Sequence, residues 1–369
     1  MSISTTPTLA QIGLRRGSAR RQRGLTLIEF MISITIGMII VVALTLLIAR
    51  QSATQGEFEK SSRQIENGRF AMRILNDDIQ MAGFFGELSD VGAPVSFPNP
   101  CATALTDLEA ALPFPVQGYD LPSTGSWPFT CINTDNYLPG TDILVVRRAE
   151  AEATTIAAAA SAAGGFVYLQ TGLTDPVREL KRFIGTGADT SVFTLKNNAL
   201  SALTPLRRYR VNIYFVSPCS VPVSGSPCSN AADGGKPIPT LKMVELTTLV
   251  GAPAMTTTPL VEGIENMQID YGFDTTADGS PDGQFKSTAA AVADWSNVVA
   301  LRVHLLARNL DSSPDYIDSK IYTLGYNAAS APQTVTASTD SYGNNVRTYK
   351  RRVFSQSIRL VNPSGRRDQ

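Results

Sequence analysis

A single acidic side chain lies inside the longest apolar run of this 369-residue sequence. Residues 25–49 carry only one charged side chain, that of Glu29, five positions beyond Gly24. Residues 1–23 contain five arginines and no acid. A carboxylate within a hydrocarbon layer is costly unless a cation pairs with it or it reaches the interface. Glu29 therefore needs either a cationic partner or a position at the membrane edge.

Residues 25–49 are long enough to cross a membrane. At about 1.5 Å per residue, a helix of this length spans a hydrocarbon core of roughly 30 Å. Basic residues resist translocation, so we expect a cytoplasmic N-terminus and an exported body. An ordinary secretory signal would place small residues at a cleavage site after the apolar run. Here Ala49 is followed directly by Arg50, which makes such a site poor.

Three aspartates, Asp274, Asp278 and Asp282, recur every four residues in the glycine-containing segment FDTTADGSPDG. Carboxylates in a glycine-rich loop are typical ligands of calcium. No glutamate closes the segment as in an EF-hand loop, and aspartate and glycine also serve turn geometry. We expect a hairpin loop here and keep calcium as the alternative. The sequence indicates no other cofactor.

All four cysteines follow the apolar run. An exported chain folds in an oxidising compartment, where cysteines form disulfides. Proximity in the sequence favours Cys101 with Cys131 and Cys219 with Cys228, although four cysteines allow three connectivities. Disulfides are favoured over a metal site, because the chain has no C-x-x-C spacing and one histidine.

The sequence contains no catalytic motif of the common kinds. G-x-S-x-G, H-E-x-x-H and G-x-x-x-x-G-K-[ST] are all missing, so we expect no enzyme. The one histidine, His304, alternates with apolar residues in a strand-like run, which predicts a solvent-facing side chain. Basic clusters at 207–210, 350–352 and 366–367 suggest nucleic-acid binding, but the formal net charge is zero and stacking aromatics are few. Solvated strand faces are the better interpretation, and nucleic acid is not an expected partner.

The apolar run should continue as an amphipathic helix. An apolar residue recurs every seven positions: Phe58, Ile65, Met72 and Ile79. This stripe among charged residues predicts one helix face packed against a folded body. Gly83 and Gly86 should end the helix. Glycine costs up to about 1 kcal/mol in a helix interior, so the internal glycines are candidate soft points: Gly37, Gly56 and Gly68.

The rest of the chain consists of predicted strands and loops. Residues 87–140 are rich in Pro, Gly, Ser and Asn, which predicts a long, weakly structured excursion closed by a disulfide. Alternating or continuous apolar runs predict strands at 142–148, 166–170, 192–196, 206–216, 241–250, 266–273, 298–308 and 346–360. A long N-terminal helix followed by mainly antiparallel strands is an α+β fold.

The junction at Gly24 resembles the class III signal of type IV pilins and of type II secretion pseudopilins. The shared features are a basic leader, a glycine, an apolar helix and a glutamate five positions after the glycine. The resemblance implies that a prepilin peptidase cuts after Gly24 and leaves Leu25 as the mature, methylated N-terminus. Leucine stands where the family most often has phenylalanine. The resemblance also implies that Glu29 pairs with the N-terminal amine of a neighbouring subunit during assembly.

Four segments are specifically similar to PilW-type minor pilins: RFAMRILNDDIQMAGFFG, GIENMQIDYGFD, WSNVVALRVHLLAR and YKRRVFSQSIRLVN. The resemblance implies a pilin-like fold, in which a long helix packs on a mainly antiparallel β domain. It implies a minor pilin that is held in the inner membrane, primes type IV pilus assembly and sits at or near the tip. Its expected partners are other minor pilins, the major pilin, the prepilin peptidase and the inner-membrane assembly platform.

The expected domains are a cleaved leader, two half-helices and a body. Their ranges are 1–24 for the leader, 25–49 for the transmembrane half-helix, 50–85 for the amphipathic half-helix and 86–369 for the exported β-rich body. Two alternatives stay open. A minor pseudopilin of a type II secretion system would share all these parts, whereas a tip adhesin would use residues 87–140 as its ligand surface.

Overall fold

The computed structural model of the chain describes Gly24 and residues 26–88, 90–120, 127–162 and 164–367. The chain divides into two compact units, one up to Gly56 and one from Glu57 onward. One continuous helix, α1 (Leu27–Gln80), belongs to both units. Gly37, Gly56 and Gly68 lie inside it without interrupting it, so the predicted soft points do not break the helix.

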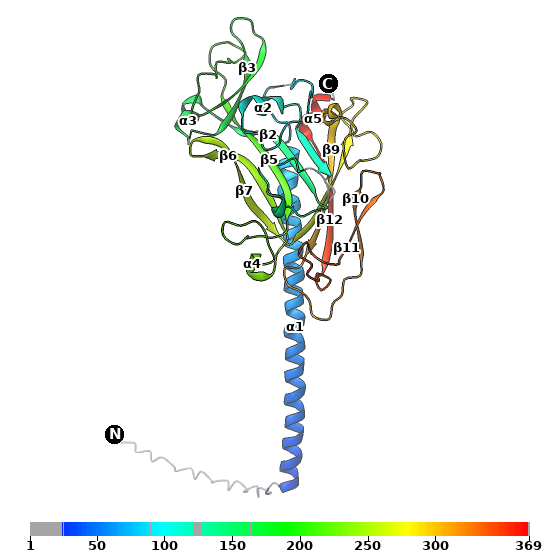
Figure 1. The fold of residues 1–369 in the computed structure, drawn as a ribbon. Coiled ribbons are helices and arrows are strands. Elements are labelled where there is room, and N and C mark those ends of the chain that lie inside the picture. The colour runs from blue at the N-terminus through cyan, green and yellow to red at the C-terminus, as the bar shows by residue number, and fades with distance from the viewer. Residues whose placement is uncertain (1–23, 25, 89, 121–126, 163, 368–369) are drawn as a thin grey trace, which may run out of the picture. The chain divides into compact units, whose positions relative to one another are not determined.

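The body from Glu57 onward is built from antiparallel strands (Figure 1). The strands are Val116–Asp120 (β1), Asp142–Thr154 (β2), Val167–Leu173 (β3), Leu180–Thr186 (β4), Leu206–Ser217 (β5), Thr240–Leu249 (β6), Ala252–Glu262 (β7), Ile264–Phe273 (β8), Val298–Arg308 (β9), Ile321–Tyr326 (β10), Pro332–Thr336 (β11) and Arg351–Arg359 (β12). A seven-stranded sheet has the order β1-β2-β5-β3-β4, with β6 also pairing with β5 and β7 pairing with β6. The other described sheets are β12-β9-β8 and the hairpin β10-β11. The α+β class is confirmed.

Short helices connect these strands. They are α2 (Leu105–Ala110), α3 (Ile156–Ser161), α4 (Ala232–Gly235) and α5 (Val361–Arg367), with the 3₁₀ turns η1 (Thr134–Asn136) and η2 (Val292–Asn297). They have between three and seven residues, which is too short to be stable without the packing of their neighbours.

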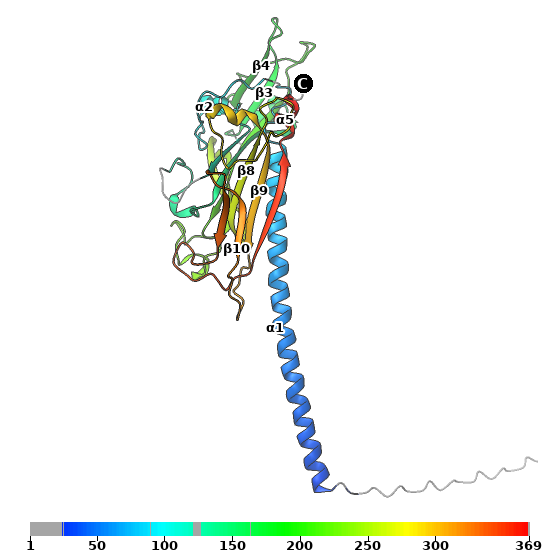
Figure 2. The same cartoon turned by 90° about the vertical axis from the view of Figure 1, so that its right-hand side faces the viewer.

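The C-terminal part of α1 packs against both larger sheets. Leu75 and Ile79 are fully buried in one cluster with residues of β2, β5, β8 and β9, and Figure 2 shows α1 running beside β9 and β12. The predicted apolar stripe is right at Met72 and Ile79 but wrong at Phe58, which is 71% exposed. A strict seven-residue repeat drifts by about 20° per heptad on a straight helix, so Phe58 has rotated away from the buried face.

The described residues of 87–140 lie mostly outside helices and strands and are closed by the Cys101–Cys131 disulfide, yet they cover part of the seven-stranded sheet. This segment contains α2, β1 and η1, and Leu108, Leu112 and Phe129 are buried in a second cluster with residues of β2 and β5. The central strands β2 and β5 are therefore buried on both faces, which agrees with the continuous apolar run of β2. The prolines and glycines of this segment predicted its irregular backbone, but the irregular spacing of its apolar residues gave no sign that they are buried.

The disulfides join the cysteines that lie closest in the sequence. Cys101 pairs with Cys131 inside the covering layer, and Cys219 pairs with Cys228 in the loop after β5. The strand predicted at 192–196 is wrong, since only Lys196 makes isolated bridges there. The sequence also failed to indicate β7, because Pro253 and Pro259 argue against a strand.

Candidate functional site on the N-terminal helix

The start of α1 is closed by a reciprocal cap between Thr26 and Glu29. Glu29 Oε2 accepts hydrogen bonds from the Thr26 backbone N–H at 3.0 Å and from Thr26 Oγ1 at 2.9 Å. The Glu29 N–H donates to Thr26 Oγ1 at 3.4 Å. This is the T-x-x-E capping box, a local signal that was present in the sequence and was missed. Gly24 is exposed, and Leu25 lies outside the described residues.

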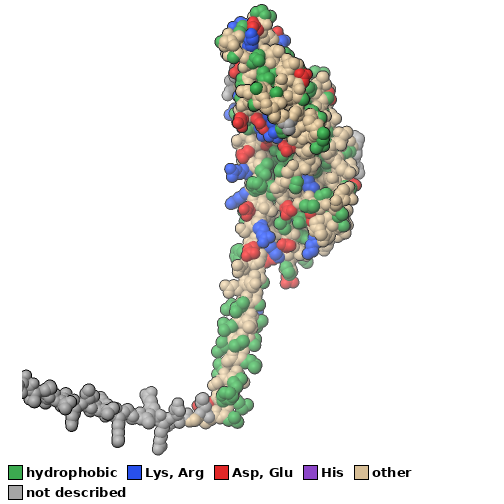
Figure 3. Space-filling model, turned by 90° about the vertical axis from the view of Figure 1, so that its left-hand side faces the viewer, with side chains coloured by type: hydrophobic (Ala, Val, Ile, Leu, Met, Phe, Trp, Pro, Cys, Tyr) green, Lys and Arg blue, Asp and Glu red, His purple; other side chains and the backbone are tan. Residues whose placement is uncertain are grey.

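The first half of α1 has no partner within its own unit. Every residue from Thr26 to Gln55 is exposed, and the side chains that gather on this part of the helix are hydrophobic (Figure 3). Its length and composition suffice to cross a membrane. A helix that is apolar all round is stable when lipid or other apolar helices cover it. Glu29 is the one acidic side chain on this part, and its carboxylate already caps the helix start.

Asp78 fixes the last turns of α1 to the seven-stranded sheet. Its carboxylate is only 5% exposed and accepts three hydrogen bonds. The donors are Arg148 Nε at 2.6 Å, Asn212 Nδ2 at 2.9 Å and Tyr214 Oη at 2.8 Å. The pair with Arg148 is charge-assisted and joins α1 to β2, while the other two bonds join α1 to β5. Sequence reasoning missed this anchor, because Asp77 and Asp78 look alike there.

A second polar anchor holds the beginning of the docked segment. Glu57 accepts hydrogen bonds from Lys350 Nζ at 2.5 Å, Lys60 Nζ at 2.9 Å and Ser313 Oγ at 2.7 Å. These donors lower the pKa of Glu57 to about 2. Two turns further on, Gln64 Nε2 donates to the carbonyl oxygens of Ala307 and Lys350, both at 2.8 Å.

Gly68 is where α1 approaches β12 most closely. A Cβ at this position would overlap the ring of Phe354, whereas a Cβ at Gly56 would meet nothing within 4 Å. We expect Gly68→Ala to destabilise the body by about 1–2 kcal/mol, because overpacking costs more than the helix gains. Gly56→Ala, the matched control, should be neutral or stabilising by up to about 1 kcal/mol. Thermal unfolding of the full chain in detergent measures both, and equal stabilisation by the two changes would contradict the close approach.

Two parts of the chain match known families. Residues 19–45 match the prokaryotic N-terminal methylation motif, and residues 228–362 match the type IV pilus-assembly protein W family, PilW. Together the two matches support a type IV pilin-like protein of the PilW family. They support a minor pilin of the type IV pilus, and the apolar helix and the prepilin motif fit an anchor in the inner membrane. The searches of curated proteins and of solved structures gave no match.

The two matches fall on different parts of the chain. The methylation motif covers the leader junction and the apolar half of α1, and the PilW match runs from Cys228 past the end of β12. Domains of the pilin family are structural rather than catalytic. The cleavage after Gly24, the new N-terminus at Leu25 and the intersubunit role of Glu29 stay predictions.

The aspartate loop of the PilW-family match is held by its own carboxylates. Asp274 is fully buried and accepts from the N–H groups of Ala277 at 2.6 Å and Gly279 at 2.9 Å. Burial alone would raise the pKa of Asp274, but these donors and Arg367 hold it below its usual value. Asp282 accepts from the N–H of Thr275 at 2.6 Å. These bonds form the expected hairpin loop.

Calcium binding at this loop stays a prediction. Asp278 lies between the two carboxylates in sequence and accepts from the Ser280 N–H at 2.9 Å. Within the described residues, no three acidic, histidine or cysteine side chains converge in a way that suits a metal ion. To bind calcium, the carboxylate of Asp274 or Asp282 would have to give up its hydrogen bonds from backbone N–H groups and coordinate the ion instead.

The prediction that His304 faces solvent is wrong. His304 is 8% exposed, with Nδ1 2.8 Å from Ser355 Oγ and Nε2 3.2 Å from Asp270 Oδ2. Alternation placed it correctly on the face away from α1. The β10 strand covers part of that face, since the Tyr326 N–H donates to Asp270 Oδ1 at 3.1 Å.

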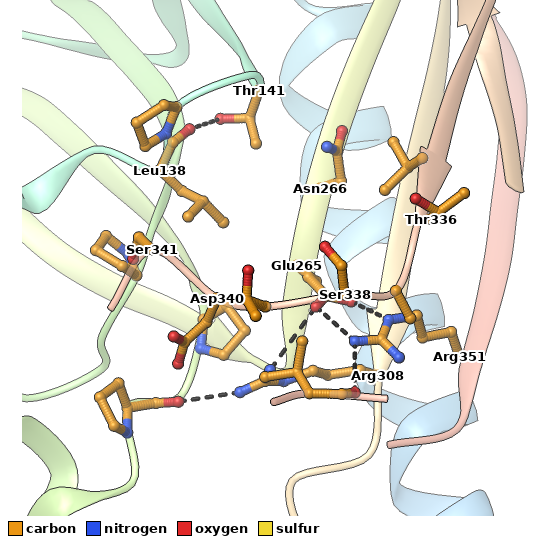
Figure 4. Close-up of a pocket in the computed structure, with 18 residues that line it drawn as sticks. Leu138, Thr141, Glu265, Asn266, Arg308, Thr336, Ser338, Asp340, Ser341 and Arg351 are labelled. Atoms are coloured by element: carbon orange, nitrogen blue, oxygen red, sulfur yellow. Dashed lines mark hydrogen bonds and ion pairs between the residues drawn. The ribbon is translucent and has the colours of Figure 1, made fainter. Parts of the chain in front are cut away.

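A crevice between the sheets contains an internal ion cluster (Figure 4). Its volume is about 410 Å³, and Glu265, Arg308 and Arg351 line it. Glu265 Oε1 accepts from Arg351 Nη2 at 2.8 Å and lies 3.7 Å from Arg308 Nη1. The side chain of Arg351 is 1% exposed. Because the charges in the crevice neutralise one another, the cluster joins β8, β9 and β12 and offers little attraction to a charged ligand.

The basic clusters considered for nucleic acid are largely engaged within the body. Arg210 pairs with Glu150 at 2.5 Å and Glu245 at 3.0 Å. Arg367 pairs with Asp274 at 3.0 Å, and the Arg208 guanidinium stacks on the Phe166 ring at 3.7 Å. These arginines make contacts within the body and are partly buried, so they do not form the solvated strand faces that the sequence analysis favoured.

Proposed function

We propose that this PilW-family chain primes type IV pilus assembly and remains at or near the tip of the filament. The observation that carries the proposal is the division of α1. Its first half is apolar and exposed on all sides, and its last turns are fixed to the body by Asp78. The first half of such a helix can contact lipid before assembly and other pilin helices afterwards. Its last turns stay bound to the body throughout.

The proposed sequence of events begins with cleavage after Gly24 by a prepilin peptidase. The new amine of Leu25 would then lie near Glu29, and a neighbouring subunit's amine would compete with Thr26 for the same carboxylate. Pairing a buried carboxylate with a cation offsets its cost inside an apolar helix bundle. Other minor pilins, the major pilin and the assembly platform in the inner membrane are the proposed partners.

A deletion strain tests the proposal. We expect loss of surface pili and of twitching motility while export of type II secretion substrates continues, with recovery on expression of the wild-type gene. Loss of secretion with intact pili would reassign the chain to the pseudopilins of a type II system. Pili of normal number and length in the deletion strain would contradict a priming role.

A tip adhesin cannot be tested by deleting residues 87–140. This segment supplies Leu108, Leu112 and Phe129 to the buried layer on the seven-stranded sheet. Its removal would expose that layer and unfold the body. Adhesion would then be lost because the protein is unfolded, whether or not the segment binds a ligand. Substitutions at exposed positions of the segment, such as Val95, which is 93% exposed, leave the core intact.

A further inference from the structure

The outer edge of β12 carries free backbone groups. β12 is the terminal strand of the sheet β12-β9-β8, and no described strand pairs with its other side. The Asn309 N–H donates to the Lys350 carbonyl at 3.0 Å, and the Leu360 N–H donates to the Val299 carbonyl at 2.8 Å. Hydrogen-bonded pairs alternate along an antiparallel ladder, and this register is unbroken. Even-numbered residues of β12 therefore bond to β9, and Val353, Ser355 and Ser357 point their N–H and C=O groups outward.

This edge lacks the features that normally prevent edge pairing. Proteins blunt free strand edges with proline, charge or bulges. The edge strand β7 contains two prolines, and the edge strand β4 carries Lys181 and Arg182. In β12 the arginines stand at the two ends of the strand, at positions 351, 352 and 359. The central residues 353–358 contain no proline, no charged side chain and no register shift. An unblunted edge of this length is a template for an added strand.

A basic groove runs beside the free edge. It lies between α1 and β12, has a volume of about 360 Å³ and is lined by Arg69, Arg73, Phe354 and Gln356 among others. Both arginines are exposed, and Arg73 has only a long contact of 3.9 Å to Asp77. No acidic side chain of the described chain lines the groove. Side chains on one face of an added strand would point toward these arginines, because successive side chains alternate across a strand.

We propose that β12 and this groove bind an extended segment of a different pilus subunit, with acidic residues at alternate positions. The segment pairs its backbone with Val353, Ser355 and Ser357 and places its carboxylates on Arg69 and Arg73. A second copy of this chain does not fit through its described edge strands. β4, β10 and β11 carry no acid, and β1 and β7 carry one each. The two acids of β8 are engaged within the body, Glu265 with Arg351 and Asp270 with His304. This inference gives the proposed function a partner, and it rests on that proposed function.

Photo-crosslinking in the piliated cell tests the docking site with the full-length chain. The probe is p-benzoyl-phenylalanine placed at Gln356, which is exposed and lines the groove. We expect a product with another pilus subunit, and mass spectrometry should locate the joined residue in an extended segment with alternating acids. The paired changes Arg69→Glu and Arg73→Glu should lower the yield of this product about tenfold, as loss of roughly 1.4 kcal/mol of binding predicts.

Matched controls separate the site from general damage. Arg63→Glu reverses a charge on an exposed residue of the same helix outside the groove lining and should leave the product unchanged. Ser357→Pro removes one outward N–H and should lower the yield, whereas Ser357→Ala removes only the hydroxyl and should not. A product formed with a second copy of this chain, or a yield unaffected by the charge reversals, would overturn the proposal.

The docking site and the proposed function fail in different ways. A chain that is cut after Gly24 and recovered in sheared pili, but gives no product at Gln356, overturns the docking site alone. A chain that stays uncut and is missing from pili overturns the proposed function and the docking site with it.

Discussion

Gly24→Val is expected to abolish maturation of this chain. The variant should accumulate as a precursor that retains its arginine-rich leader, and it should not restore pili in the deletion strain. The reason is steric and electrostatic: a branched side chain replaces glycine at the proposed cleavage position, and five arginines then stay attached to the helix. Immunoblots of membrane fractions show the precursor, and N-terminal mass analysis of the wild type should identify Leu25 as the first residue.

Gly17→Val is the matched control, because it makes the same change in the same leader seven positions upstream. We expect this variant to be processed and to restore pili. Normal processing of Gly24→Val, or a wild-type N-terminus after Ala49, would show that the chain uses an ordinary secretory signal. In that case Glu29 would leave with the signal, and the apolar helix would have no role in a filament.

The features that sequence reasoning predicted well depend on residues close together in the chain. The apolar run, the glutamate within it and the glycine before it are all contained in residues 23–50, so composition alone identifies the helix and its processing signal. The disulfides join cysteines separated by 30 and 9 residues, and proximity was enough to favour them. The α+β class followed from the order of periodic segments.

The features that could not be predicted from the sequence depend on contacts between segments that are far apart in the chain. Alternation placed His304 on the correct face of β9, but nothing local shows that β10 covers this face. Residues 87–140 look like a loop because their apolar residues are irregularly spaced, yet the sheet that they cover needs an apolar partner on both faces. Asp77 and Asp78 are adjacent and chemically identical, and only the position of β2 and β5 makes one an anchor and the other a surface residue.

Asp78→Ala is expected to cause the largest loss of stability among single changes at the polar anchors. Removing one partner of a buried ion pair costs about 3–5 kcal/mol, because the remaining charge and hydrogen-bonding groups stay buried. Here the change leaves Arg148, Asn212 and Tyr214 without their shared acceptor. For a body of this size the unfolding midpoint should fall by about 5–8 °C, measured by circular dichroism of the full chain in detergent.

Asp77→Ala is the control, since the neighbouring carboxylate is 66% exposed and makes only a long contact with Arg73. It should change the free energy of unfolding by less than about 0.5 kcal/mol. Asp78→Asn keeps the shape and two acceptor lone pairs but loses the charge, so it should lie between wild type and Asp78→Ala. If Asp78→Ala unfolds at the same temperature as Asp77→Ala, the last turns of α1 are held by apolar packing alone. The division of α1 into a free half and a fixed half would then rest on Leu75 and Ile79.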